Sequence, residues 1–89
     1  MTKQYVIDIK GFVETDGTRA PMVIKVSRPR QAEGADDWYC EILAPVLFEQ
    51  AQRIFGIDES QARHLSIRFL KSLLGKRALY SESGQPITL

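Results

Sequence analysis

The stretch GIDESQARHLSIRFLKSLLGKRA, residues Gly56 to Ala78, decides how this chain folds. Asp58 and Gln61 stand three residues apart, as in a capping box, which satisfies free N–H groups at the start of a helix. Gly75 is the expected end, because glycine readily adopts the left-handed conformation found there. The spacing at 100° per residue predicts one long amphipathic helix. Its apolar stripe comprises Ala62, Leu65, Ser66, Phe69, Leu70 and Leu73, widened by Ile67 and Leu74.

Strand patterns fill the chain before this helix. Apolar and polar residues alternate in QYVIDIKGFVET (4–15), APMVIKVSR (20–28) and DWYCEIL (37–43), which is typical of half-buried strands. The Asp-Gly pair at residues 16 and 17 fits a hairpin turn between the first two strands. Gly11 indicates a bulge or a close approach of another backbone. Residues 28–37 lack large apolar side chains, and they predict a solvated loop.

The segment between the third strand and the helix is ambiguous. Leu47, Ala51, Ile54 and Phe55 have helical spacing, and Pro45 would suit a first helical turn. The alternation in QAQRIFG instead favours a strand. Periodicity alone slightly favours a helix over residues 45–55, with a strand as the alternative.

A resemblance favours the strand. The sequence WYC, with Trp38 and Cys40, followed by RIFGIDESQARHLSIRFLKSLL resembles a family of small bacterial proteins of unknown function. In that family's pattern a Trp-x-Cys strand precedes a Gly-Ile/Val-Asp-Ser-x-Gln-Ala helix start, and the residues before the glycine form a strand. The resemblance therefore implies a strand over residues 50–55. It carries no catalytic residue and no activity to this chain.

These elements predict an α+β fold in a single domain over residues 1–89. We expect an antiparallel meander of four or five strands, with one long C-terminal helix packed on one face. Residues 78–89 either add a short edge strand or fray.

Composition limits the classes of partner. The chain has 89 residues, with 12 Lys and Arg against 11 Asp and Glu, so no global field attracts nucleic acid or anionic lipid. No apolar run approaches the about 20 residues that span a bilayer. A single cysteine excludes an internal disulfide. We expect a cytoplasmic protein of bacterial type that has no membrane partner.

The sequence offers no catalytic constellation. His64 is the one histidine, and it is expected on the solvent side of the helix, away from Cys40 on the core side of its strand. The cluster of Glu33, Asp36 and Asp37 lacks the spacing of a calcium loop. We therefore expect no enzyme activity, no metal site and no cofactor.

Two kinds of surface remain as binding candidates. One helix covers one side of a sheet, so the other side is expected to carry an apolar set available to a protein partner or a second copy: Val6, Phe12, Val23, Tyr39 and Leu43. The leading hypothesis is a non-enzymatic binding or assembly module, with a homodimer through this face as one form. The alternative is a nucleic-acid-associated protein that uses the basic helix over residues 58–77. Its expected contacts are Arg28, Arg30, Arg68 and Lys71, although scattered basic residues without a known motif make nucleic acid the less favoured partner.

Overall fold

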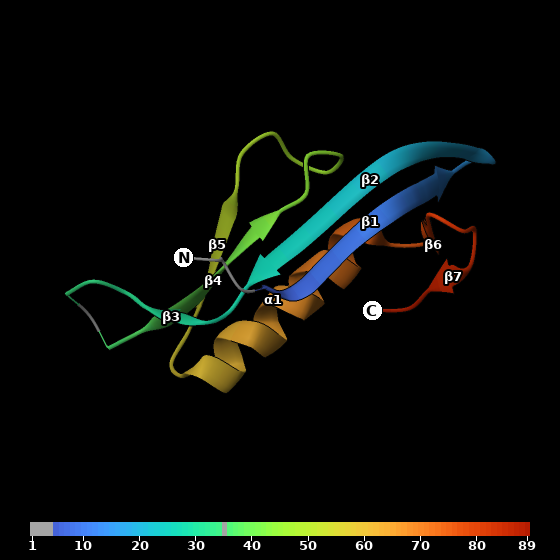
Figure 1. Cartoon of the computed structure of the whole chain (residues 1–89). Helices are drawn as coiled ribbons and strands as arrows, with labels where there is room; N and C mark the ends of the chain where they lie inside the picture. Colours follow the sequence, from blue (N-terminus) through green and yellow to red (C-terminus); the bar gives the residue numbers. More distant parts are fainter. Residues whose placement is uncertain (1–4, 35) are drawn as a thin grey trace.

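In the part of the chain that the structure describes, one antiparallel sheet has one helix packed on one of its faces (Figure 1). The computed structural model describes residues 5–34 and 36–89. Its elements are β1 (Tyr5–Thr15), β2 (Thr18–Ser27), β3 (Arg30–Gln31), β4 (Trp38–Leu43), β5 (Gln52–Gly56), α1 (Glu59–Leu74), β6 (Ala78–Ser81) and β7 (Pro86–Ile87).

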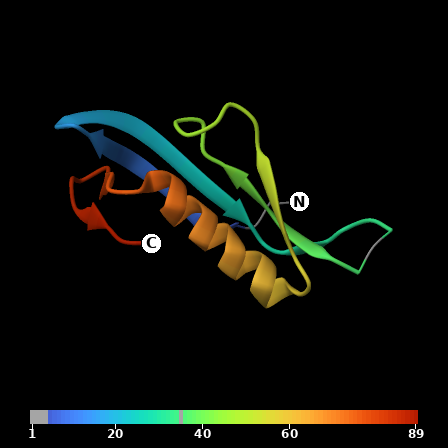
Figure 2. The same cartoon turned by 180° about the vertical axis from the view of Figure 1, so that it is seen from behind.

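The four longer strands before the helix form the predicted meander, since β1 pairs with β2, β2 with β4, and β4 with β5. The prediction of four or five strands is too low, because the sheet has seven strands within the described residues. β6 returns after the helix to the free side of β1, and β7 pairs with β6. β3 lies beside the start of β4. The helix begins near the end of β5 and finishes beside β6, and in both views its axis runs in nearly the same direction as β1 and β2 (Figures 1 and 2).

The hairpin turn matches its prediction. Asp16 and Gly17 both have positive φ, 51° and 79°, as the two central residues of a tight hairpin turn require. Gly11 marks a close approach of backbone, because a Cβ there would collide with the carbonyl oxygen of Tyr80 in β6. The glycine therefore allows the chain after the helix to join the sheet, so residues 78–81 form a strand and do not fray.

Both ends of α1 also follow the sequence. Asp58 Oδ1 accepts a hydrogen bond of 2.7 Å from the N–H of Gln61, and Gln61 Oε1 accepts one of 2.7 Å from the N–H of Ile57. Gly75 has a φ of 56° and donates its N–H to the carbonyl of Lys71. These bonds satisfy backbone groups that the helix itself leaves free.

The side chains of α1 that face the sheet are not those predicted to lie at the centre of its apolar stripe. Ala62, Ser66, Leu70 and Leu74 are its buried residues, whereas Leu73 is 40% exposed. Phe69 is half-buried at the flank, and its ring lies 6.3 Å from that of Phe48. The apolar arc is wider than the contact with the sheet. Its spacing alone does not set the rotation of the helix.

The strand prediction for residues 50–55 is confirmed in type, with the observed strand at residues 52–56. Helical hydrogen bonding in the preceding segment is limited to one turn, where the N–H groups of Leu47 and Phe48 both donate to the carbonyl of Ala44. Gly56 closes the strand against the helix, because a Cβ there would lie 2.5 Å from the backbone nitrogen of Ala62. This contact brings β5 and the first turns of α1 together.

The core lies between the helix and alternate residues of the strands. Ile24, Val26, Cys40, Ile42 and Leu70 are fully buried. This placement confirms the predicted core side of the second and third long strands.

Candidate functional site

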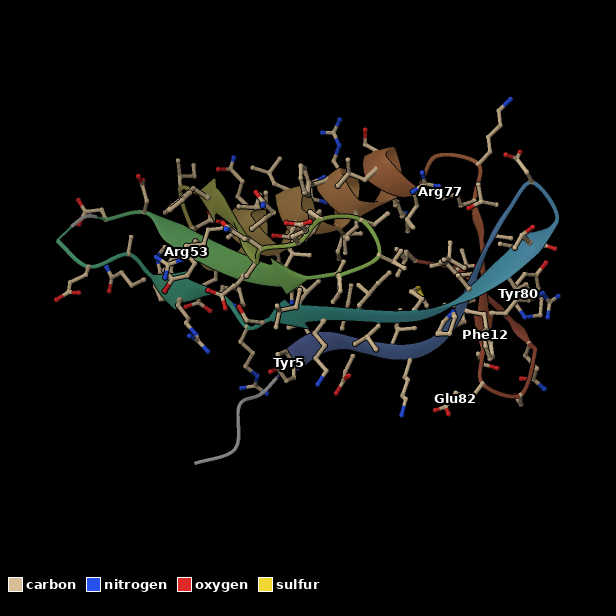
Figure 3. All side chains as sticks on the ribbon, turned by 90° about the horizontal axis from the view of Figure 1, so that it is seen from above. Tyr5, Phe12, Arg53, Arg77, Tyr80 and Glu82 are labelled. Atoms are coloured by element: carbon tan, nitrogen blue, oxygen red, sulfur yellow. The ribbon has the colours of Figure 1, made fainter. Side chains whose placement is uncertain are left out.

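The side of the sheet opposite α1, which we call the outer face, carries several large apolar side chains from the strands. It is formed by the residues that alternate with the core residues in β1, β2, β4 and β5. In the described part of the chain, no helix covers it, and Figure 3 shows Tyr5 and Phe12 on the side of the strands away from α1. Its large apolar side chains are Phe12, Val23, Tyr39, Leu43 and Phe55.

Four of the five predicted interface residues lie on the outer face, namely Phe12, Val23, Tyr39 and Leu43. The prediction is wrong for Val6. A shift of register between Tyr5 and Ile7 interrupts the alternation, and Val6 packs against the core. One extra residue in a strand moves the side chains before it to the opposite faces of the sheet. The local sequence pattern does not indicate this shift.

Three cations of the outer face lie over aromatic rings. The guanidinium of Arg19 is 3.9 Å from the ring centre of Tyr80, and that of Arg53 is 4.8 Å from the ring centre of Tyr39. The ammonium of Lys25 is 5.2 Å from the ring centre of Tyr5. Such contacts stabilise by about 0.5–1 kcal/mol at exposed sites. Each of these basic side chains therefore lies over a tyrosine ring of the same face.

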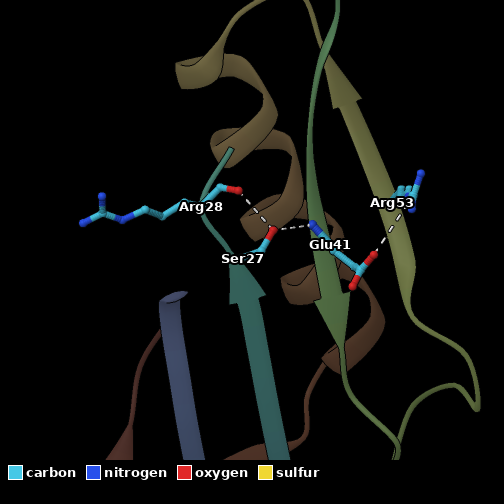
Figure 4. A network of polar contacts seen from close by, with 4 residues as sticks. All are labelled: Ser27, Arg28, Glu41 and Arg53. Atoms are coloured by element: carbon cyan, nitrogen blue, oxygen red, sulfur yellow. Dashed lines mark hydrogen bonds and ion pairs between the residues drawn. The ribbon is translucent and has the colours of Figure 1, made fainter. Parts of the chain in front are cut away.

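An aromatic cluster occupies the end of the outer face formed by β4 and β5. The rings of Tyr39 and Phe55 lie 5.6 Å apart at an interplanar angle of 44°, and Phe55 remains 51% exposed. Arg53 forms a 3.6 Å ion pair with Glu41 (Figure 4). Arg30 lies directly across from Tyr39 in the register of β3 and β4. The cluster therefore combines an open ring with two arginines, one of them paired.

A polar network fixes β4 beside the end of β2. The N–H of Glu41 donates to Ser27 Oγ at 2.8 Å, and that hydroxyl donates to the carbonyl of Arg28 at 3.1 Å (Figure 4). Ser27 is almost fully buried, and both of these bonds satisfy its hydroxyl. The strand bearing Tyr39 is thus held where the ladder between β2 and β4 has ended.

A second feature of the outer face is a hollow of about 450 Å³ over β1 and β2. Phe12, Pro21, Val23 and Val46 supply apolar surface, while Lys10 and Glu82 supply opposite charges. The turn after β4 contributes Val46, which is 42% exposed. The hollow therefore has an apolar surface with a charged group of each sign.

Sequence reasoning missed Arg53, Phe55 and Val46 as surface residues. They belong to the segment whose period was ambiguous, so no face was assigned to them. The alternation in QRIFG carries the signal for the first two, because it places Arg53 and Phe55 on the side opposite Ile54. Val46 lies in a turn, and only tertiary folding brings it to the hollow.

The groups considered for catalysis lie apart. Cys40 is buried in the core, whereas His64 is exposed on α1. Burial raises the pKa of the Cys40 thiol, although a hydrogen bond with Ser66 and the charge of Arg63 oppose the shift. In residues 5–34 and 36–89, no three His, Cys, Asp or Glu side chains gather as metal ligands. None of the described helices is long and apolar enough to cross a membrane.

The candidate nucleic-acid contacts do not form one surface. Arg28, Arg30, Arg68 and Lys71 are all exposed. Arg30 shares the outer face with Tyr39, whereas Arg68 and Lys71 lie on the helix, which packs against the other side of the sheet. An extended strand of nucleic acid would have to pass around the molecule to meet all four.

Comparison with known proteins gives no match to a family model, to a curated protein or to a solved structure. The resemblance inferred from the Trp38 and Gly56 segments therefore stays a prediction.

Proposed function

We propose that this protein is a non-enzymatic, cytoplasmic binding or assembly module whose outer face receives a protein partner. The observation that carries the proposal is that this face combines large apolar side chains with an open hollow. The helix supplies the core on the opposite side, so the apolar residues of the outer face are not needed to close the fold.

The chemistry of the face fits a protein partner. Protein interfaces commonly have an apolar centre surrounded by a polar rim. The hollow has this composition, with Phe12 and Val23 beside Lys10 and Glu82. A partner that inserts an apolar side chain and pairs with both charges would use each of these groups.

The test is site-specific photo-crosslinking in extract of the native host. A crosslinking amino acid replaces Lys10 beside the hollow or, as the matched control, Arg68 on α1, because both are exposed basic residues. We expect a discrete adduct from position 10 and none from position 68. The adduct should disappear when Val23→Glu is added, while circular dichroism shows an unchanged fold. Adducts that are equal at both positions, or that survive Val23→Glu, would refute the outer face as the binding surface.

A second candidate function is single-stranded nucleic-acid binding at the aromatic cluster. The specific observation is the exposed ring of Phe55 beside Tyr39 and Arg53, since bases stack on aromatic rings and arginines contact phosphates. Fluorescence anisotropy with a labelled single-stranded oligonucleotide at low salt tests it. Binding that is lost with Arg53→Glu and kept with Arg68→Glu would support this candidate. An unchanged anisotropy at every protein concentration would refute it.

A further inference from the structure

Among the described residues, β5 pairs with β4 on one side and with no strand on the other, and we call this second side the open edge of β5. We propose that two copies of this chain associate by antiparallel pairing of β5 with β5, in a register centred on Ile54. The partner is a second copy, and the contact is the edge of the sheet. This inference does not depend on what the outer face binds.

The other sheet edges carry features that discourage pairing. The part of β2 before Lys25, which has no strand partner on the β4 side, contains Pro21. β7 has two residues and begins with Pro86, which has no N–H to donate, and β3 also has only two residues. The uncovered part of β1 begins with a register shift, and it ends where β6 pairs with Gly11. By contrast, β5 has five residues without proline, lysine or bulge, and within the described chain it pairs only with β4.

Pairing of β1 with β1 of a second copy is opposed by like charges in one register and by an occupied position in another. A register centred on Asp8 sets two aspartates against each other. A register centred on Ile9 brings Ile7 of the second copy level with Gly11, where Ser81 already pairs. At β5, a register centred on Ile54 meets neither obstacle.

The backbone of β5 directs hydrogen-bonding groups to its open edge. The N–H of Glu41 points from β4 toward β2, where it donates to Ser27 Oγ. In an antiparallel ladder the N–H and C=O of one residue point to the same side, so Glu41 makes no ladder bond to Arg53, its opposite neighbour in β5. The N–H and C=O of Arg53, and those of Phe55 two residues later, therefore point away from β4. Both residues are exposed.

These directions select the register. Centring the pair on Ile54 sets Arg53 of each copy opposite Phe55 of the other, and this arrangement forms four backbone hydrogen bonds within the observed strands. The same pairs bring a guanidinium to an aromatic ring twice, the contact that Arg53 already makes with Tyr39. Centring on Arg53 would oppose two like charges, and centring on Phe55 would require Ile57, which lies beyond the strand.

Apolar contact and the path of the helix agree with this pairing. Ile54 packs at the border of the core, and it would meet Ile54 of the second copy at the closely spaced position of the ladder. The helix starts near the end of β5 and runs away from it toward β6, which lies near the opposite edge of the sheet (Figure 1). Because the two strands run in opposite directions, the starts of the two helices would lie at opposite ends of the paired strands.

The first experiment measures association by sedimentation over a range of concentrations. We expect a reversible dimer. Phe55→Arg places a second positive charge opposite Arg53 and should raise the dissociation constant by about tenfold or more, because like charges directly opposite destabilise a sheet. Phe55→Glu is the matched control: it removes the same ring but offers Arg53 an opposite charge, and it should keep the dimer. A monomer at every concentration up to about 1 mM, where association is already very weak, would overturn the proposal.

The second experiment tests the register. Ile54→Cys should form a disulfide between two copies under mild oxidation, because the symmetric position brings the two cysteines face to face. Ile9→Cys, at the competing β1 edge, should stay unlinked. The proposal fails if Ile9→Cys crosslinks and Ile54→Cys does not, or if Phe55→Arg and Phe55→Glu weaken the dimer equally. The crosslinking experiment at Lys10 tests binding to the outer face independently. Dimerisation through β5 and binding at the outer face can therefore be refuted separately.

Discussion

The two faces of the sheet use the same alternating strands in different ways. On the helix side, Ile24, Val26 and Ile42 are fully buried. Cys40, on the same strand as Ile42, is fully buried as well. On the outer face, basic side chains lie along aromatic rings, and Phe55 stays half in solvent. The difference shows that burial is concentrated on one face, whereas the other face keeps aromatic and basic side chains accessible to solvent.

The largest expected effect compares two leucines of the same helix. Leu70→Ala should lower the free energy of unfolding by about 2–5 kcal/mol, because Leu70 is fully buried and its removal leaves a cavity. Leu73→Ala is the same chemical change at a residue that is 40% exposed, and it should cost less than half as much. Chemical denaturation of both variants measures the difference. Equal losses would mean that the helix is rotated differently from the structure described above.

The next effect concerns the start of α1, the helix that covers the buried face of the sheet. Asp58→Ala should destabilise the protein by about 1 kcal/mol, because the N–H of Gln61 loses its acceptor. Asp58→Asn keeps an acceptor oxygen and should retain most of the stability. The midpoint of urea unfolding reports both. An unchanged midpoint in Asp58→Ala would contradict the capping role.

A smaller effect on the buried face is expected at alkaline pH. Burial raises the pKa of Cys40 above its ordinary value of 9.0, so the unfolded chain loses this proton at a lower pH than the folded one. The contribution to stability is complete below pH 9.0 and declines as the pH rises through the folded pKa. Unfolding free energies of the protein and of Cys40→Ala, measured across this range, should differ in slope. Parallel curves would show that the thiol has the same pKa in both states.

The smallest effect is expected on the solvent side of the helix. Arg68→Glu combined with Lys71→Glu should change the free energy of unfolding by no more than about 0.5 kcal/mol per residue, because both side chains are exposed. Thermal unfolding checks this expectation. A large loss would mean that these side chains support the fold and that the contrast between covered and uncovered surfaces is incomplete.

Much of the core face could be predicted from the sequence, because alternation in a strand assigns residues to opposite sides. Ile24, Cys40 and Ile42 follow this rule. Val6 departs from it at the register shift, which depends on how β1 meets β2. On the candidate site, Phe12 and Tyr39 could be placed, whereas Arg53 and Phe55 could not, because a segment with two plausible periods has no assigned face.

The sequence by itself determined the features that arise within a few residues. Asp58 and Gln61 cap the helix through bonds three and four residues apart, and Asp16 and Gly17 turn the hairpin through their own backbone angles. The tertiary structure alone decided which flank of the helix meets the sheet, and that β6 returns to β1 at Gly11. It also decided that, among the described residues, β5 has a strand neighbour on one side only. Caps and turns are local hydrogen-bonding problems, whereas helix rotation and strand order depend on contacts between segments far apart in the chain, which no local spacing encodes.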